Sequence, residues 1–509
     1  MARDSSGEEG RRRAEVMGPS ANFRERVLGG GAWLAATQTA AQLIQFAVTA
    51  VLAHVLGPRD FGLFALCAVV LGLSVVFREV GMPEALVQAP RLTAGHKNGA
   101  FWTTAALAAA LAALMAAGAG PVARLLGDVR VAPLVRLAAV DFVIASFGMV
   151  PAAILSRDLA FRRLGVCDVA GVAANAAVAL PLAFRGFGAR SLVWGLVAGD
   201  AARTALLFVQ ARWRPGWRMT RRDVVELFRF GRSVMGASAA YSVRTYIDKL
   251  LVGRFLGAAT LGGYNLSFRI MTAPQQRFGW LISRLTLPAF SSIQDDDARV
   301  GRIYLKALTL IALVVTPAMA GLAVVADDFV RMVYGPAWLF IVPALRVMCA
   351  AGVFYAVGTT VGPVLVAQGR PQWLFRLSLL LTASLAAGIA VTLPFGLTAV
   401  GVGFTVAAAL GYGVGFVMVA RLLRLRARAF LGAFRSPAVA AAAAAFAATA
   451  VRVALAGYGP GVRLGGAVAA GVGAWAFAVW LSRVPALVEV GAFARGRWTT
   501  FVAARRSSA

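Results

Sequence analysis

The chain has 509 residues, of which 60% are hydrophobic and 14% are charged, and its formal net charge is +29. So few charges in so long a chain exclude an ordinary soluble domain. A charge this basic would indicate nucleic-acid binding in a soluble protein, but here the cations lie between long apolar runs, so we expect no nucleic-acid partner.

The chain opens with a polar segment, residues 1–26, in which Arg11, Arg12 and Arg13 mix with Glu8 and Glu9. This segment has no apolar core, so it is no cleavable signal peptide, and we expect a disordered cytoplasmic tail. Apolar runs of roughly 18–25 residues follow, each long enough to cross a ~30 Å hydrocarbon layer as a helix. Strand periodicity is absent, and backbone polar groups in lipid must pair within their own segment, so these runs should be α-helices.

Fourteen such runs can be counted, which predicts about fourteen transmembrane helices in an all-α membrane protein. Their centres lie near Leu43, Leu71, Leu111, Val143, Val172, Leu196, Ser242, Met271, Leu313, Val353, Leu385, Leu410, Ala447 and Val472.

Cations alternate between the loops that join these runs. The strongly basic loops lie at 91–97, 157–163, 212–232, 299–302, 370–376 and 421–435, and the intervening loops carry few cations. By the positive-inside rule, the basic loops and both termini are cytoplasmic. The loop at 212–232 is expected to contact anionic lipid headgroups.

An internal repeat links the two halves of the chain. The motif at 56–66 (Leu-Gly, Gly62, Phe64, Leu66) recurs 200 residues later at 256–266, where Tyr264 replaces Phe64. Similar matches join 151–157 with 363–369, and Gly188 with Gly396. Because the offset contains an even number of runs, the halves share one orientation, which predicts two parallel six-helix repeats.

The expected organisation therefore has five segments. It comprises a cytoplasmic tail (1–26), a six-helix bundle (27–215), a second six-helix bundle (216–430), two extra transmembrane helices (431–485) and a basic cytoplasmic tail (486–509). The three cysteines lie far apart in apolar runs, so we expect each to pack as a small hydrophobic side chain. The paired glycines Gly195 and Gly199, and likewise Gly411 and Gly415, are expected to permit close helix packing.

The stretches Asp248-Lys-Leu-Leu-Val-Gly-Arg-Phe-Leu-Gly257 and Leu261-Gly-Gly-Tyr-Asn-Leu-Ser-Phe-Arg269 resemble a signature of polysaccharide exporters and oligosaccharide flippases. These proteins belong to the multidrug/oligosaccharidyl-lipid/polysaccharide transporter superfamily. The resemblance extends to residues 56–64 and 363–371, covers roughly residues 25–430, and is strongest to the colanic-acid-exporter (Wzx) type. It implies alternating access of the two bundles around a central, often cationic, cavity.

Ionisable residues concentrate in the seventh and eighth runs, although each charge in the middle of a span costs about 2.5–3.5 kcal/mol on insertion scales. Arg244 and Asp248 are one helical turn apart, within reach of an ion pair, and Tyr241 shares their face. Lys249 is expected to point away from this face by more than a right angle. The eighth run adds Arg269 and, on the following turns, Gln276 and Arg277.

Two interpretations of these residues stay open. In the first, Arg244 and Asp248 are a structural pair that docks one helix on its neighbours. In the second, the seven residues line a cavity in which Arg244 meets an anionic cargo, because the planar guanidinium binds phosphate bidentately. Asp248 would then hold Arg244 in place, or exchange H⁺ or Na⁺. Elsewhere, Asp200 and Arg203 are expected to neutralise each other, and Arg78 and Glu79, which end the second run, could lie within it or at the membrane interface.

An enzyme is not expected, because the chain has two histidines without metal-ligand spacing, no nucleophile motif and no nucleotide-binding loop. The expected activity is translocation of a lipid-linked oligosaccharide or polysaccharide from the cytoplasmic to the outer face of a bacterial inner membrane. The alternatives are a multidrug or cation antiporter, a peptidoglycan lipid-precursor flippase, or a membrane-embedded saccharide polymerase or ligase. We expect no cofactor beyond coupling H⁺ or Na⁺, and expect as partners the lipid-linked saccharide, anionic lipids and other polysaccharide-assembly proteins.

Overall fold

The computed structural model describes residues 21–79, 81–88, 92–291 and 297–482. Within these ranges it does not describe the side chains of residues 21–32, 34–35, 79, 230–238, 240, 275–291 and 297. The predicted tail at 486–509 and most of that at 1–26 lie outside the described residues.

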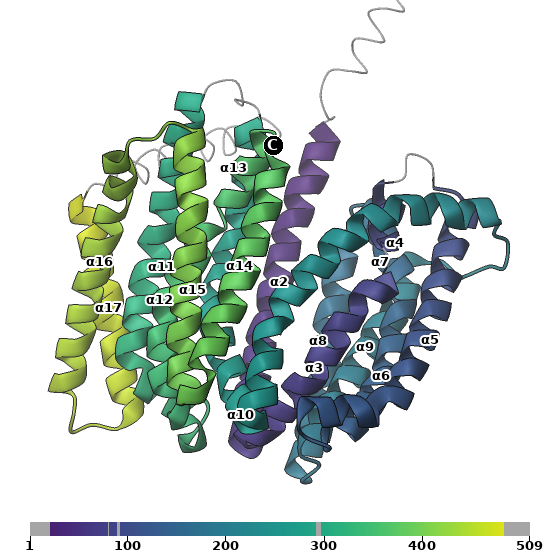
Figure 1. Cartoon of the computed structure of the whole chain (residues 1–509), viewed down its shortest axis with the longest axis horizontal. Coiled ribbons are helices and arrows are strands. Elements are labelled where there is room, and N and C mark those ends of the chain that lie inside the picture. Colours follow the sequence, from purple (N-terminus) through teal and green to yellow (C-terminus); the bar gives the residue numbers. More distant parts are fainter. Residues whose placement is uncertain (1–20, 80, 89–91, 292–296, 483–509) are drawn as a thin grey trace, which may run out of the picture. The chain divides into compact units, whose positions relative to one another are not determined.

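The described residues form helices joined by turns, which confirms the predicted all-α class (Figure 1). In chain order these are α2 (Ala21–Val55), α3 (Pro58–Glu79), α4 (Met82–Gln88), α5 (Ala94–Leu126), α6 (Val131–Phe147), α7 (Met149–Arg157), α8 (Phe161–Phe184), α9 (Ala189–Ala211), α10 (Arg221–Ser291), α11 (Asp297–Val333), η1 (Pro336–Ile341), α12 (Val342–Gly358), α13 (Val361–Ala367), α14 (Pro371–Thr392), η2 (Leu393–Phe395), α15 (Gly396–Leu422), α16 (Ala427–Ala454) and α17 (Pro460–Ser482).

All fourteen predicted centres fall within these helices, two of them within α10. This helix breaks at Gly257, where φ is 81° and ψ is 171°, a conformation that glycine adopts without a Cβ clash. We call residues 221–256 and 258–291 its first and second arms. By length and composition, ten stretches of the described residues can cross a membrane, and one of them, 371–422, holds both α14 and α15. A total of fourteen crossings therefore stays a prediction.

The chain divides into two compact units. Unit 1 contains residues 1–55, 70–124 and 129–242, and unit 2 contains residues 56–69, 125–128 and 243–509. The five-segment organisation and the central cavity stay predictions.

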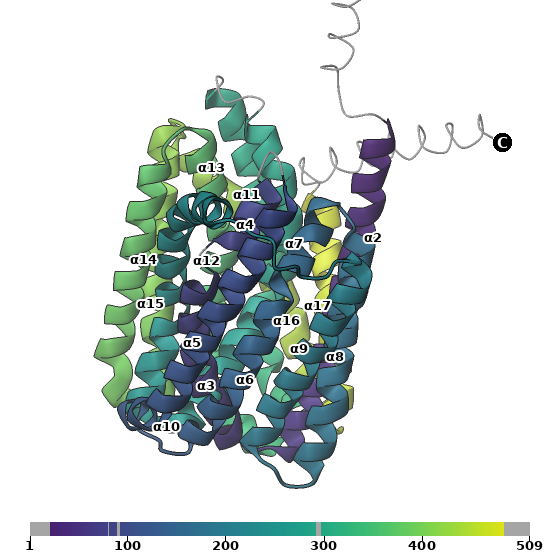
Figure 2. The same cartoon turned by 90° about the vertical axis from the view of Figure 1, so that its right-hand side faces the viewer.

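Unit 1 is built on close packing of long helices. Figure 2 shows α5, α6, α8 and α9 running in the same general direction, with the short α4 and α7 together at one end. Helices α8 and α9 approach closely because both are glycine-rich at the contact: a Cβ added at Gly199 would lie 2.8 Å from the Gly171 carbonyl oxygen. A Cβ at Gly195 would lie 2.7 Å from that of Ala179. The predicted packing role of Gly195 and Gly199 is confirmed.

Unit 2 packs by the same principle. An added Cβ would overlap the Leu381 side chain at Gly411 and would lie 3.0 Å from Leu377 Cδ2 at Gly415, so both glycines serve the contact of α14 with α15. The last two helices, α16 and α17, pack on α11. Charge reinforces this contact, because buried Asp328 of α11 accepts a hydrogen bond of 2.7 Å from Arg452 and forms an ion pair with Arg463 at 2.7 Å.

The repeat motifs contact each other reciprocally. A Cβ added at Gly62 would overlap the carbonyl oxygen of Ala258, and a Cβ added at Gly262 would overlap the carbonyl oxygen of Pro58. Positions 58 and 62 are the repeat counterparts of 258 and 262, so the same contact occurs twice with the roles exchanged. A related pair of glycines, Gly188 before α9 and Gly396 at the start of α15, both adopt positive φ.

Candidate functional site

The ionisable residues of α10 meet across the break at Gly257. The hydroxyl of Tyr264, on the second arm, donates a hydrogen bond of 2.8 Å to Oδ2 of Asp248 on the first. The ammonium of Lys249 lies 3.4 Å from both oxygens of the same carboxylate and donates to the carbonyl oxygen of Thr245 at 2.7 Å. Asp248 is only 2% exposed and Tyr264 is fully buried, so this is an ion pair inside unit 2.

Aromatic rings enclose the cation. The Lys249 ammonium lies 4.6 Å from the centroid of the Phe268 ring, in a cation–π contact. Phe268 in turn packs edge-on against Tyr355 of α12 at 6.2 Å and against Phe404 of α15 at 5.8 Å. Tyr355 continues the cluster to Tyr412 at 5.3 Å. Three elements of unit 2 therefore hold the ion pair in a mostly apolar environment.

We name Asp248, Lys249, Tyr264 and Phe268 the ion-pair cluster. Its two charges cancel. The phenol hydroxyl, a backbone carbonyl and a ring face supply further polar contacts to the buried carboxylate and ammonium. Breaking a buried pair by removing one partner costs about 3–5 kcal/mol, so each charge depends on the other. Chemically, the cluster offers an ammonium that an anionic ligand would reach only in competition with Asp248.

The expected direction of Lys249 is wrong. Adjacent helical positions do project about 100° apart, but the four-carbon stem is flexible enough to return the ammonium to the neighbouring carboxylate. The structure shows Lys249 and Tyr264 as partners of the Asp248 carboxylate. Arg244 itself is partly buried, and Tyr241 is 62% exposed.

The other predicted site residues lie on the second arm. Arg269 is exposed although the neighbouring positions Phe268 and Ile270 are half-buried and buried. Among the residues that the structure describes, no carboxylate pairs with its guanidinium. The side chains of Gln276 and Arg277 lie outside the described residues. All seven residues thus remain a predicted ligand-binding set, of which Asp248 and Lys249 are brought together.

The sequence analysis missed Tyr264 and the aromatic rings, although one signal was present. The repeat matches Tyr264 with Phe64, and position 248 with Val48. The first half therefore lacks both the hydroxyl and the carboxylate at the corresponding positions. Because both polar groups occur together in only one half, the repeat could have indicated that they interact.

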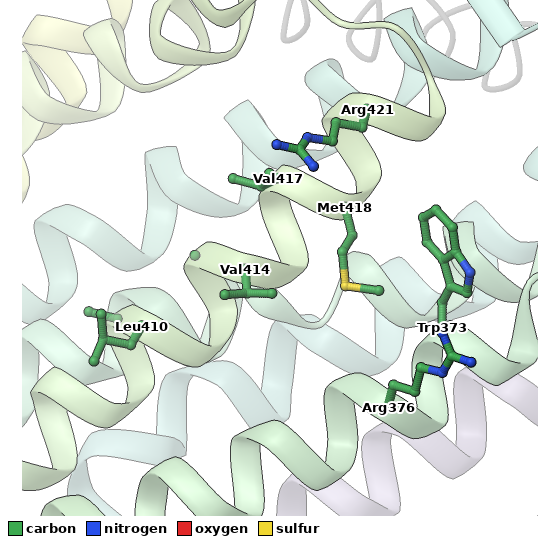
Figure 3. Close-up of a pocket in the computed structure, with 9 residues that line it drawn as sticks. Trp373, Arg376, Leu410, Val414, Val417, Met418 and Arg421 are labelled. Carbon is green, nitrogen blue, oxygen red and sulfur yellow. The ribbon is translucent and has the colours of Figure 1, made fainter.

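A second feature of unit 2 is a pocket of about 600 Å³ between α14 and α15. Figure 3 shows an apolar row of Leu410, Val414, Val417 and Met418 along α15. Arg421 continues this row, and Arg376 and Trp373 face it from α14. An apolar row that ends in guanidinium groups matches the two parts of an anionic lipid, its acyl chain and its headgroup.

Comparison with known proteins places these features in a family. Residues 51–343 match the family model described as polysaccharide biosynthesis protein. The lipopolysaccharide biosynthesis protein WzxC of Escherichia coli (strain K12) is 26% identical over 400 residues, which cover 78% of this chain and 79% of that protein. The succinoglycan biosynthesis transport protein ExoT of Rhizobium meliloti (strain 1021) is 24% identical over 358 residues, which cover 70% and 72%.

Among solved structures, the inward closed conformation of the lipid II flippase MurJ superposes with a TM-score of 0.74 at 13% identity, covering 88% of this chain and 98% of that one. This likeness shows a shared fold, and with the apolar helices it establishes a multi-pass membrane protein. Because the family model matches more than half of the sequence, the chain belongs to the polysaccharide biosynthesis protein family.

Proposed function

We propose that this protein is a flippase or exporter that moves a lipid-linked oligosaccharide or polysaccharide across the inner membrane, from the cytoplasmic to the outer face. Membership of the polysaccharide biosynthesis protein family and the names of its relatives support this activity. The alternation of basic and weakly charged loops supports an orientation with both termini in the cytoplasm.

One observation carries the substrate class. Between residues 241 and 274, four cations (Arg244, Lys249, Arg254 and Arg269) accompany a single carboxylate, Asp248, for a net charge of +3. Excess cations in apolar helices are costly unless they face water or an anion. An anionic headgroup, such as a phosphate or a uronic acid, would supply the missing negative charge.

In this mechanism Arg269, which is exposed as a residue, makes the first contact with the headgroup. Lys249 stays neutralised by Asp248, which keeps the rest of the path from binding the anion too tightly to release it. No covalent chemistry is required: alternating access, as the family resemblance implies, would carry the headgroup across while a lipid tail stays in the bilayer. The pocket between α14 and α15 would hold an anionic lipid at the protein surface.

The test is export in a strain that lacks the gene. Cells should accumulate the lipid-linked saccharide on the cytoplasmic side, and the wild-type gene should restore surface polysaccharide. The double variant Arg244→Ala, Arg269→Ala should fail to restore it at an unchanged protein level. A matched control removes two exposed cations of unit 2, Arg302→Ala and Arg331→Ala, and should export normally.

Normal export by the Arg244→Ala, Arg269→Ala variant would overturn the cationic path. If the deletion strain instead accumulated a peptidoglycan precursor, or lost only drug resistance, the saccharide assignment would be wrong.

A further inference from the structure

Unit 1 contains a polar pocket of about 500 Å³. Residues of α3, α4, α6, α7 and α9 line it, and the ionisable ones are Arg78, Glu84, Asp200 and Arg203. The pocket between α14 and α15 is lined mainly by apolar side chains, and so is a further pocket between α11, α16 and α17. The pocket of unit 1 is therefore more polar than these two. Its composition indicates a ligand that interacts with charge.

A second carboxyl group lies beside Asp200, which lines the pocket. Asp141, on α6, is 5% exposed, and its carboxyl group is hydrogen-bonded to that of Asp200 on α9. Oδ1 of Asp141 is buried, and no N–H or O–H group of the described residues donates to it. Two carboxylate groups are both acceptors, so a hydrogen bond between them exists only when one of them carries a proton.

The surrounding charges lead to the same conclusion. Arg78, on α3, interacts electrostatically with both carboxyl groups, and its guanidinium is held by the carbonyl oxygen of Phe142 at 3.2 Å and over the Phe142 ring at 4.5 Å. Arg203 also faces Asp200, but its Nε donates to Asp168 of α8 at 2.8 Å. The expected neutralisation of Asp200 by Arg203 is therefore incomplete, because Asp168 takes the direct bond.

A charge count follows from these contacts. Two arginines, Arg78 and Arg203, face three aspartates, so the cluster carries one net negative charge when every group is ionised. Burying an uncompensated charge costs several kcal/mol, and carboxyl groups avoid this by taking up a proton. One proton makes the cluster neutral. Glu84 lies at the exposed mouth of the pocket and does not enter this count.

We infer that Asp141 and Asp200 together bind a single proton and exchange it with water in the pocket. On release, the O–H bond of one carboxyl group breaks and the proton passes to water. Arg78 then stabilises the two carboxylates that remain. Asp200 provides the route, because it is only partly buried and lines the pocket, whereas Asp141 is buried and does not line it. That this exchange drives transport rests on the proposed function.

A proton fits this site better than a metal cation. Sodium and divalent ions need several oxygen ligands around one point. No group of three or more carboxylate, histidine or cysteine ligands occurs among the described residues. The pair supplies what a proton requires, two facing oxygens.

The experiment uses the full-length protein in liposomes and infrared spectroscopy, which resolves the C=O stretching band of a protonated carboxyl group. The wild type should show this band at neutral pH. The variants Asp141→Asn and Asp200→Asn should each lose it, because the remaining carboxylate accepts a hydrogen bond from the new amide and stays ionised. Asp158→Asn removes an exposed carboxylate of unit 1 and should keep the band.

Absence of the band in the wild type would overturn the inference, as would its persistence in both asparagine variants. Loss of the band when NaCl replaces choline chloride would assign a sodium site and also overturn it. If neither variant folds, the wild-type result and the salt comparison still decide. The spectra need no saccharide, so they are independent of the proposed function, whereas normal export by both folded variants would overturn only the coupling role.

Discussion

The ion-pair cluster makes a quantitative prediction for Lys249→Met. Methionine preserves much of the side-chain length but removes the ammonium, which leaves the carboxylate of Asp248 buried without its cation, while the Tyr264 hydroxyl still donates to it. Removing one member of a buried pair costs about 3–5 kcal/mol of folding free energy, and the remaining hydrogen bond keeps the loss toward the lower end of this range. The cation–π contact with Phe268 disappears as well, at about 0.5–2 kcal/mol.

The measurement is thermal unfolding of the purified protein in detergent, with Lys306→Met as a control that removes an exposed lysine of unit 2. Lys249→Met should unfold at a clearly lower temperature than this control. The double variant Asp248→Asn, Lys249→Met should recover most of the loss, because neither charge is then left alone. Equal unfolding temperatures for the two lysine variants, or a double variant less stable than Lys249→Met, would refute the reasoning.

Three further predictions concern other parts of the chain. Gly62→Val should lower the unfolding temperature strongly, since its side chain would overlap the Ala258 carbonyl, whereas Gly57→Ala, which has open space, should change it little. At the start of α10, hydrogen bonds from Thr220 lower the pKa of Asp223. Its stabilising contribution is therefore present above the unfolded-state pKa, about 3.9, and is lost as pH falls through the folded-state value. Asp223→Asn should destabilise at pH near 7 and converge with wild type in acid. The double variant Arg376→Ala, Arg421→Ala should retain less anionic lipid after purification, as mass spectrometry can measure.

Each of these has an outcome that contradicts it. A Gly62→Val protein as stable as Gly57→Ala would contradict the close backbone contact. A difference in stability between Asp223→Asn and wild type that stays constant down to strong acid would contradict the stabilising role of the hydrogen bonds from Thr220. Unchanged lipid retention in the arginine variant would remove the lipid-binding interpretation of the pocket between α14 and α15.

Hydropathy and small-residue patterns predicted the helices well, because each pattern is a property of a single segment of the sequence. The run centred on Ser242 and the run centred on Met271 became the two arms of α10, separated at Gly257, where the predicted Leu-Gly turn lies. Cys67, Cys167 and Cys349 are buried and form no disulfide, as expected of small apolar side chains. Such features follow from local chemistry and need no knowledge of the partner helix.

Side-chain pairing was harder to predict, because it depends on distant residues and on flexible stems. Lys249 was placed by its Cβ direction, yet its ammonium returns to Asp248. Asp141 is the one acidic residue of α6, and nothing near it in the sequence indicated a partner. Its partner, Asp200, lies 59 positions further along the chain. Spacing rules that link residues three or four apart cannot reveal such a pair.

The repeat shows that the buried polar groups of the ion-pair cluster occur only in the second half of the chain. Asp248 and Tyr264 have Val48 and Phe64 as counterparts, so the first half fills these places with apolar side chains. In the second half, the polar groups are satisfied within the cluster by Lys249. Charge balance is thus reached without any bound ion or proton.

The first half has the opposite arrangement. An offset of 208 residues relates Gly188 to Gly396. The same offset places Ala408 opposite Asp200, so the carboxyl pair of the first half has no acidic counterpart in the second half. With Arg203 bonded to Asp168, the charges around this pair balance only when a proton is present. Since the two charges of the ion-pair cluster cancel each other, a proton-dependent step is expected to originate in unit 1. Substituting Asp200 should therefore change the pH dependence of export, while substituting Lys249 should change its extent at every pH.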